Sequence, residues 1–124
     1  MLIGSPQQPE CFLEVHLKLG YVGVEFLDSQ LRVETNYQFV KSDNGKLFLK
    51  TAISRSFDKN TAEIMQAEKY YFSPSGSVRI ELDDRVKDIV ESAEKDIDVT
   101  HNWEDIPEFG HYVSISQRER DFAH

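Results

Sequence analysis

Apolar and polar residues alternate along the first half of the chain, a pattern typical of strands with one buried face. The alternation first covers residues 13–19, resumes over 21–27 after Gly20, and is strongest over 31–39. Turn-forming residues separate these stretches, as expected for strands that pair with their neighbours in sequence. The first part of the chain therefore predicts consecutive antiparallel strands.

The clearest element is a long hairpin over residues 31–57. Its turn is Ser42-Asp43-Asn44-Gly45, where the Asn-Gly pair tolerates the positive φ angles of a tight hairpin turn. A further turn is expected over 58–61. The segment 63–82 reads as strand, turn and strand around 73–76, although the good helix formers of 62–67 leave a helix open there.

The period changes at Asp83, where apolar residues begin to recur at steps of three and four. This stripe predicts an amphipathic helix over 84–96, with Asp83 or Asp84 capping its first turn. It consists of Val86, Ile89, Val90, Ala93 and Ile97.

Together these elements predict an α+β fold, in which an antiparallel meander sheet of about six or seven strands carries one amphipathic helix on one face. A polar loop is expected over 98–108 and a last strand near 109–116. The length fits a single domain, 1–124, with an irregular lead-in over 1–10 and a loose tail over 117–124.

The net charge of −8 is concentrated in the stretch 81–108, which holds eleven Asp and Glu residues against three Lys and Arg. Eleven acids and eleven bases cancel in the rest of the chain. A field of one sign attracts a basic partner, whereas nucleic acid and anionic membranes need a basic surface. A lone Cys11, no visible secretory signal and no long apolar run predict a cytoplasmic protein.

Short motifs for phosphate binding, nucleophilic catalysis, zinc hydrolysis or a redox pair are absent from the sequence. His101 and His111 flank three acids, but their spacing matches no standard set of metal ligands. We therefore expect no catalytic residue, no metal and no cofactor.

The candidate site is instead an acidic surface on the exposed side of the expected helix and on the loop after it. An aromatic residue ringed by charge is typical of protein interfaces, so Trp103 is either an interface anchor or a plug at one end of the core. The candidate partner-binding residues are Asp84, Asp88, Glu91, Glu94, Asp98, Trp103, Glu104, Asp105 and Glu108.

The meander at 31–82, the stretch 70–76 and the acidic stretch 83–108 with Asn102-Trp103-Glu104-Asp105 resemble the immunity proteins of bacterial polymorphic-toxin and contact-dependent inhibition systems. The resemblance implies a non-catalytic function, in which the protein binds a cognate toxin, often a cationic nuclease, and blocks it. The alternative is a small-ligand pocket lined by aromatic residues, with Thr35, Tyr37 and Thr51 orienting the ligand.

Overall fold

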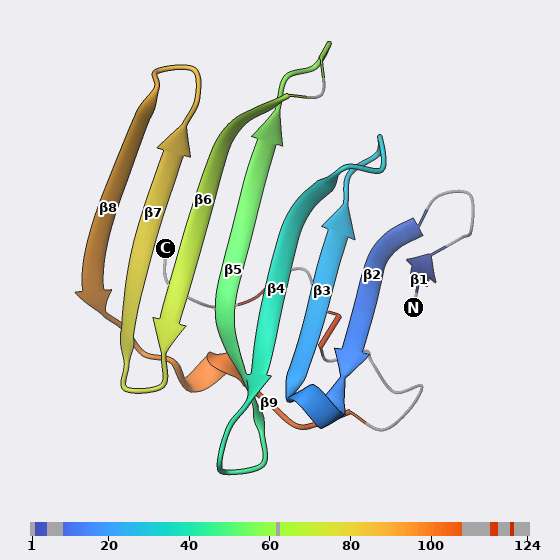
Figure 1. Ribbon diagram of the computed structural model, residues 1–124, viewed down its shortest axis with the longest axis vertical. Coiled ribbons are helices and arrows are strands. Elements are labelled where there is room, and N and C mark those ends of the chain that lie inside the picture. Colours follow the sequence, from blue (N-terminus) through green and yellow to red (C-terminus); the bar gives the residue numbers. More distant parts are fainter. Residues whose placement is uncertain (1, 5–8, 62, 108–114, 117–119, 121–124) are drawn as a thin grey trace.

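A computed structural model describes residues 2–4, 9–61, 63–107, 115–116 and 120. Eight strands follow one another as antiparallel neighbours across one large sheet, and a ninth pairs with the fifth (Figure 1). The strands are β1 (Leu2–Gly4), β2 (Pro9–His16), β3 (Tyr21–Leu27), β4 (Val33–Lys41), β5 (Leu47–Phe57), β6 (Ile64–Ser73), β7 (Ser77–Asp84), β8 (Ile89–Asp96) and β9 (Trp103–Glu104). Two short 3₁₀ turns complete the described elements, η1 (Leu17–Leu19) and η2 (Thr100–Asn102).

The predicted helix over 84–96 is wrong, and with it the α+β class. Asp84 ends β7, a turn follows, and residues 89–96 form β8, which pairs with β7 in an unbroken antiparallel register. Val86 and Val90, two members of the supposed helical stripe, are each 66% exposed. The stripe fails because most of it is exposed, with only Ile97 packed against the core, while β7 offers β8 a complete row of main-chain partners. The described residues contain no α-helix.

The segment that sequence left open between helix and strand is a strand, since β6 begins at Ile64 and pairs with both β5 and β7. The lead-in expected to be irregular contains β1, which pairs with β2. The strand predicted near 109–116 lies mostly outside the described residues, as does most of the tail over 117–124.

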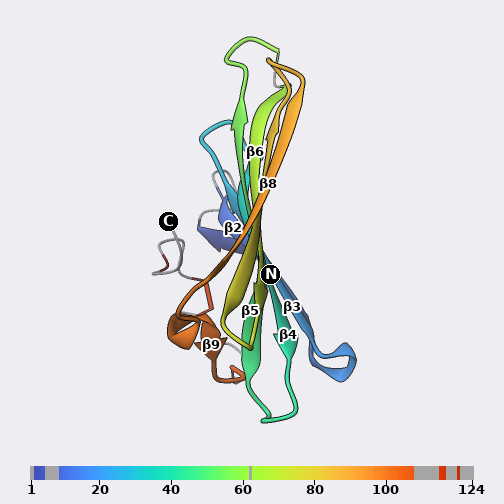
Figure 2. The same cartoon turned by 90° about the vertical axis from the view of Figure 1, so that its left-hand side faces the viewer.

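One face of the sheet carries the core. Cross-strand pairs align Leu13 with Val24, Val24 with Tyr37 and Tyr37 with Ala52, so the buried residues of four strands share this covered face. Phe39, on the same face of β4, is fully buried. Figure 2 shows the sheet nearly edge-on, with η2 and β9 on one side of it and η1 on the other.

The segment after β8 supplies the cover of this face. Val99 and Ile115 belong to the same buried cluster as the strand residues. The Arg120 guanidinium lies 4.9 Å from the ring centre of Phe39, and its Nη1 donates a 2.9 Å hydrogen bond to Glu104. The described residues of the segment after β8 therefore cover the core on this face of a single layer of strands.

β9 extends the sheet where β6 ends. It pairs with Leu47 and Phe48 of β5, whereas β6 pairs with β5 only from Thr51 onward. Just before β9, the fully buried Asn102 donates from Nδ2 to the Leu49 carbonyl at 3.0 Å. This bond joins the segment after β8 to the short stretch of β5 around Leu49 that lies between the residues paired with β9 and those paired with β6.

Four aspartates hold turns through their carboxylates. Asp28, Asp58, Asp84 and Asp98 each accept hydrogen bonds from main-chain N–H groups two to four residues later. These bonds favour the ionised carboxylate and lower the pKa of Asp28, Asp58 and Asp84 chiefly through main-chain donors. In Asp98 the Thr100 hydroxyl makes the largest contribution to the lowered pKa.

Candidate functional site

The polar side of the sheet carries a charged network between β3 and β7. The Arg55 guanidinium donates to Asn36 Oδ1 at 2.7 Å, and Lys69 Nζ lies 3.7 Å from Glu81. Arg79 lies over the Tyr71 ring at 4.5 Å and within 3.9 Å of Glu81. Each of these three cations thus has a polar, anionic or aromatic neighbour on this face.

The predicted acidic surface divides into two groups in the structure. One group follows the outermost strand β8, and the other lies at β9, with β6 and β7 between them in the sheet (Figure 1). Glu108 lies outside the described residues. The helix that was expected to gather these carboxylates on one side is absent, so their arrangement follows the sheet instead.

The two described carboxylates of the β9 group differ, since Glu104 is engaged within the protein whereas the Asp105 side chain is 90% exposed. Glu104 is paired with Arg120, and Asp105 Oδ1 lies 3.7 Å from Lys46 Nζ. Trp103 is half-buried, with its ring centre 4.8 Å from that of the buried Phe48. The structure thus places Trp103 against the core and gives both neighbouring carboxylates cationic partners.

Asp84 also has a structural role. It is 7% exposed, and its Oδ1 accepts bonds of 3.1 Å from the N–H groups of Val86 and Lys87. Gln66 Nε2 donates to Oδ2 at 3.1 Å. This carboxylate fixes the turn that leads from β7 into β8.

The β8 group remains available to a partner. Asp88, in the turn, and Glu91 and Glu94, in the strand, are all exposed, and Asp98 follows the strand. Within the described residues, ion pairs in this part of the chain are formed by Glu81, Asp83, Glu104 and Asp105, not by the carboxylates of β8.

Sequence reasoning missed Asp96, which lies at the end of β8 and is exposed. In the expected helix, Asp96 would lie outside the acidic surface that was predicted. In the observed strand it lies on the same face as Glu94, at the outermost edge of the sheet. Residues 88–98 thus hold five carboxylates and one lysine. Glu91 and Glu94 point to opposite faces, because Glu91 pairs with Leu82 and Glu94 with Arg79. The acidic feature is therefore a rim along one edge of the sheet.

Two apolar features accompany this acidic rim. Ile89 and Val90 of β8 are 44% and 66% exposed. A hollow of about 200 Å³ lies beside the strand and is lined by Ile80, Leu82, Glu91, Ser92 and Ala93. The rim therefore combines negative charge with room for an apolar side chain.

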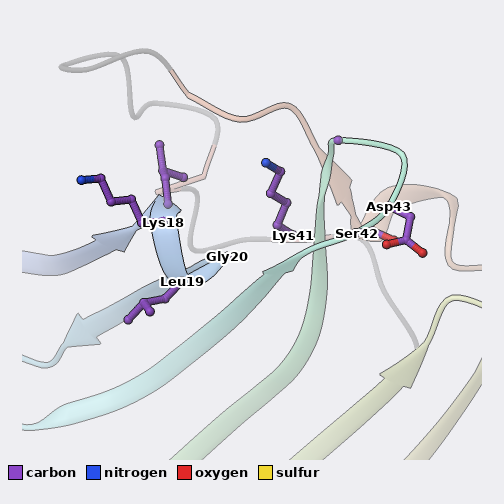
Figure 3. A pocket seen from close by; sticks show the side chains of 8 residues that line it. Lys18, Leu19, Gly20, Lys41, Ser42 and Asp43 are labelled. Atoms are coloured by element: carbon purple, nitrogen blue, oxygen red, sulfur yellow. The ribbon is translucent and has the colours of Figure 1, made fainter.

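The residues proposed to orient a small ligand do not converge. Thr35 and Tyr37 lie on the covered face, where Tyr37 is buried in the core, whereas Thr51 pairs with Gln38 on the polar face. A larger hollow, of about 530 Å³, lies between η1 and the β4–β5 turn and is open to solvent. Figure 3 shows its labelled Leu19 and Lys41 side chains pointing in different directions. Neither arrangement encloses a ligand.

Within the described residues, no group of three His, Cys, Asp or Glu side chains is placed to hold a metal ion. Cys11 is buried. None of the described helical segments has the length and apolar character that a membrane crossing requires.

Comparisons with protein-family models, with curated proteins and with solved structures find no match to the chain.

Proposed function

We propose that this chain is a non-catalytic protein-binding module that binds a basic protein partner through the acidic rim of β8. The observation that carries the proposal is the accumulation of exposed carboxylates at Asp88, Glu91, Glu94 and Asp96 along one sheet edge, with Asp98, which also holds a turn, directly after it. A field of this sign speeds the encounter with a cationic surface and repels anionic partners.

The resemblance to bacterial immunity proteins makes the partner a cognate toxin domain. A nuclease must be basic where it holds phosphates, so an acidic strand can occupy its substrate groove. In this proposal the protein acts in the cytoplasm. The toxin would be encoded immediately upstream, as the C-terminal domain of a large secreted protein.

Charged side chains on an outermost strand also have a simpler role, since they prevent sheets from aggregating edge to edge. That role requires only that some charge be present, whichever its sign. Binding to a basic partner requires negative charge at these positions. Reversing the charge therefore separates the two roles.

We expect Glu91→Lys/Asp96→Lys to slow association with the toxin domain by about tenfold at low ionic strength, because the two changes cancel the net negative charge of residues 88–98 and with it the steering field. Both residues lie opposite uncharged partners on β7, Leu82 and Ser77, so neither new lysine lies directly opposite a cation. The measurement is the association rate at several salt concentrations, together with rescue of growth when the toxin domain is co-expressed.

The matched control is Glu10→Lys/Asp43→Lys, which changes net charge equally at two exposed positions away from β8. The control is expected to keep most of the association rate. Equal rates for both double variants would contradict the rim as the binding site, and failure of the wild-type chain to bind the domain or restore growth would contradict the proposed function.

A further inference from the structure

β8 ends the sheet, and in the described part of the chain it has one strand neighbour, β7 (Figure 1). Such a strand presents every second N–H and C=O away from its neighbour. It contains no proline, which would remove a donor, and all eight of its residues are exposed. The edge is therefore a template on which another strand can form.

The hydrogen-bonding phase identifies which residues face outward. The Arg85 N–H donates to the Met65 carbonyl at 2.9 Å, so odd-numbered residues of β7 direct their main-chain groups toward β6. Even-numbered residues of β7 then face β8, and they pair with odd-numbered residues there. The outward groups of β8 accordingly belong to the even-numbered residues Val90, Ser92, Glu94 and Asp96.

Charge decides what can pair with this edge. A second copy aligned antiparallel about Ala93 would place Glu91 opposite Lys95, but it would also bring together two rims that each hold five carboxylates and one lysine. Like charges in opposed strands destabilise the pairing. A segment rich in lysine or arginine would instead be attracted to each carboxylate of the same rim.

We propose that the basic partner adds an extended segment to β8 as a further antiparallel strand. This inference rests on the proposed function and names its binding mode. Main-chain hydrogen bonds to Val90, Ser92, Glu94 and Asp96 supply affinity, and basic side chains of the partner form ion pairs with the carboxylates of β8. An apolar side chain opposite Ala93 fills the hollow lined by Ile80 and Leu82.

The probe that tests this is the peptide KTKITKVI, which is designed to run antiparallel to β8 with its lysines opposite Asp96, Glu94 and Glu91. Titration of the full chain at low ionic strength is followed by amide NMR. Binding should shift the amide signals of Val90, Ser92, Glu94 and Asp96 and protect them from hydrogen exchange.

Two N-methylated forms of the probe provide a matched comparison with the same charge and mass. Methyl groups on the third and fifth amide nitrogens point at β8 and should weaken binding at least about tenfold, because they remove two main-chain hydrogen bonds. Methyl groups on the fourth and sixth point away and should leave most of the affinity intact. This comparison requires no change in the protein.

Two proline variants make the same comparison in the chain. Ser92→Pro removes an outward N–H, so it should preserve the β7–β8 pairing and weaken the affinity for the probe by about tenfold or more. Ala93→Pro removes an N–H that faces β7 and should lower the melting temperature of the protein.

Equal binding of the two methylated probes, full binding by Ser92→Pro, or no binding of the unmethylated probe would overturn strand addition. The proposed function would survive these results if association with the toxin domain still depended on Glu91 and Asp96. Self-association of the wild-type chain, measured by sedimentation and abolished in Ser92→Pro, would make a second copy the occupant and also overturn the inference.

Discussion

Phe39→Ala is expected to lower the free energy of unfolding by about 3–5 kcal/mol, the usual cost of removing a fully buried phenylalanine. Phe39 is 0% exposed, in the middle of the covered face, and Arg120 lies over its ring. A single-layer sheet has few other places to exclude water, and domains of this size have only about 5–15 kcal/mol in total. The measurement is chemical denaturation followed by circular dichroism.

The control for this substitution is Phe12→Ala on β2. Phe12 is 39% exposed, and its loss should cost less, about 1–2 kcal/mol, because part of its ring already faces water in the folded protein. Should Phe39→Ala fail to fold, Phe39→Leu keeps the comparison measurable at a smaller cost. Similar losses for Phe39 and Phe12 would mean that the covered face is not the core.

The second large effect is expected for Trp103→Ala, which should cost about 2–3 kcal/mol, below the full value for a buried tryptophan because the ring is half-buried. The ring contacts Phe48 with an angle of 58° between the two ring planes, and β9 joins β5 through only two residue pairs. Without the ring, the C-terminal segment loses part of its attachment to the sheet. Denaturation of the variant measures this loss.

Trp103 is the only tryptophan in the chain, so its fluorescence reports this contact directly. The wild-type emission should lie between those of buried and free indole and shift fully to the red on unfolding. Phe48→Leu provides the matched control, since it removes the aromatic neighbour and keeps an apolar side chain. A free-indole emission in the native state, with no loss of stability in Trp103→Ala, would place the ring at an interface instead.

The strands of the meander could be predicted because each has one buried and one solvated face. In β4 the buried side chains of Tyr37 and Phe39 alternate with the polar Asn36 and Gln38, a pattern typical of a strand with one buried face. The Asn-Gly pair correctly marked the turn into β5, where Gly45 has the expected positive φ of 80°, but Asn44 does not have the positive φ that was also expected of it.

β8 could not be read in the same way, because both of its faces are exposed. Its residues therefore show no alternation of buried and exposed positions, and its few apolar residues recur at the steps of three and four that are typical of a helix. β8 forms because the N–H and C=O groups of β7 that face away from β6 can pair with it. This main-chain pairing does not require a particular side-chain pattern in β8, so the sequence does not show it. The pairing of β9 with β5 is equally invisible, since two residues carry no pattern.

The candidate site was predicted in its charge but not in its shape. The acidic stretch predicted one negative surface; five of its carboxylates follow one another between Asp88 and Asp98, but Glu91 and Glu94 point to opposite faces of the sheet. Glu104 and Asp105 were assigned to the same surface, yet each meets a cation brought close by the fold, Arg120 and Lys46. Such distant pairs cannot be inferred from spacing along the chain.

Amide hydrogen exchange along β8 tests most directly whether the acidic segment is a strand with a free outer edge. Glu91, Ala93 and Lys95, whose N–H groups face β7, should exchange slowly, and Val90, Ser92, Glu94 and Asp96 should exchange rapidly. Even protection along the whole segment, as a helix would give, or rapid exchange throughout would contradict the edge strand and the binding mode built on it.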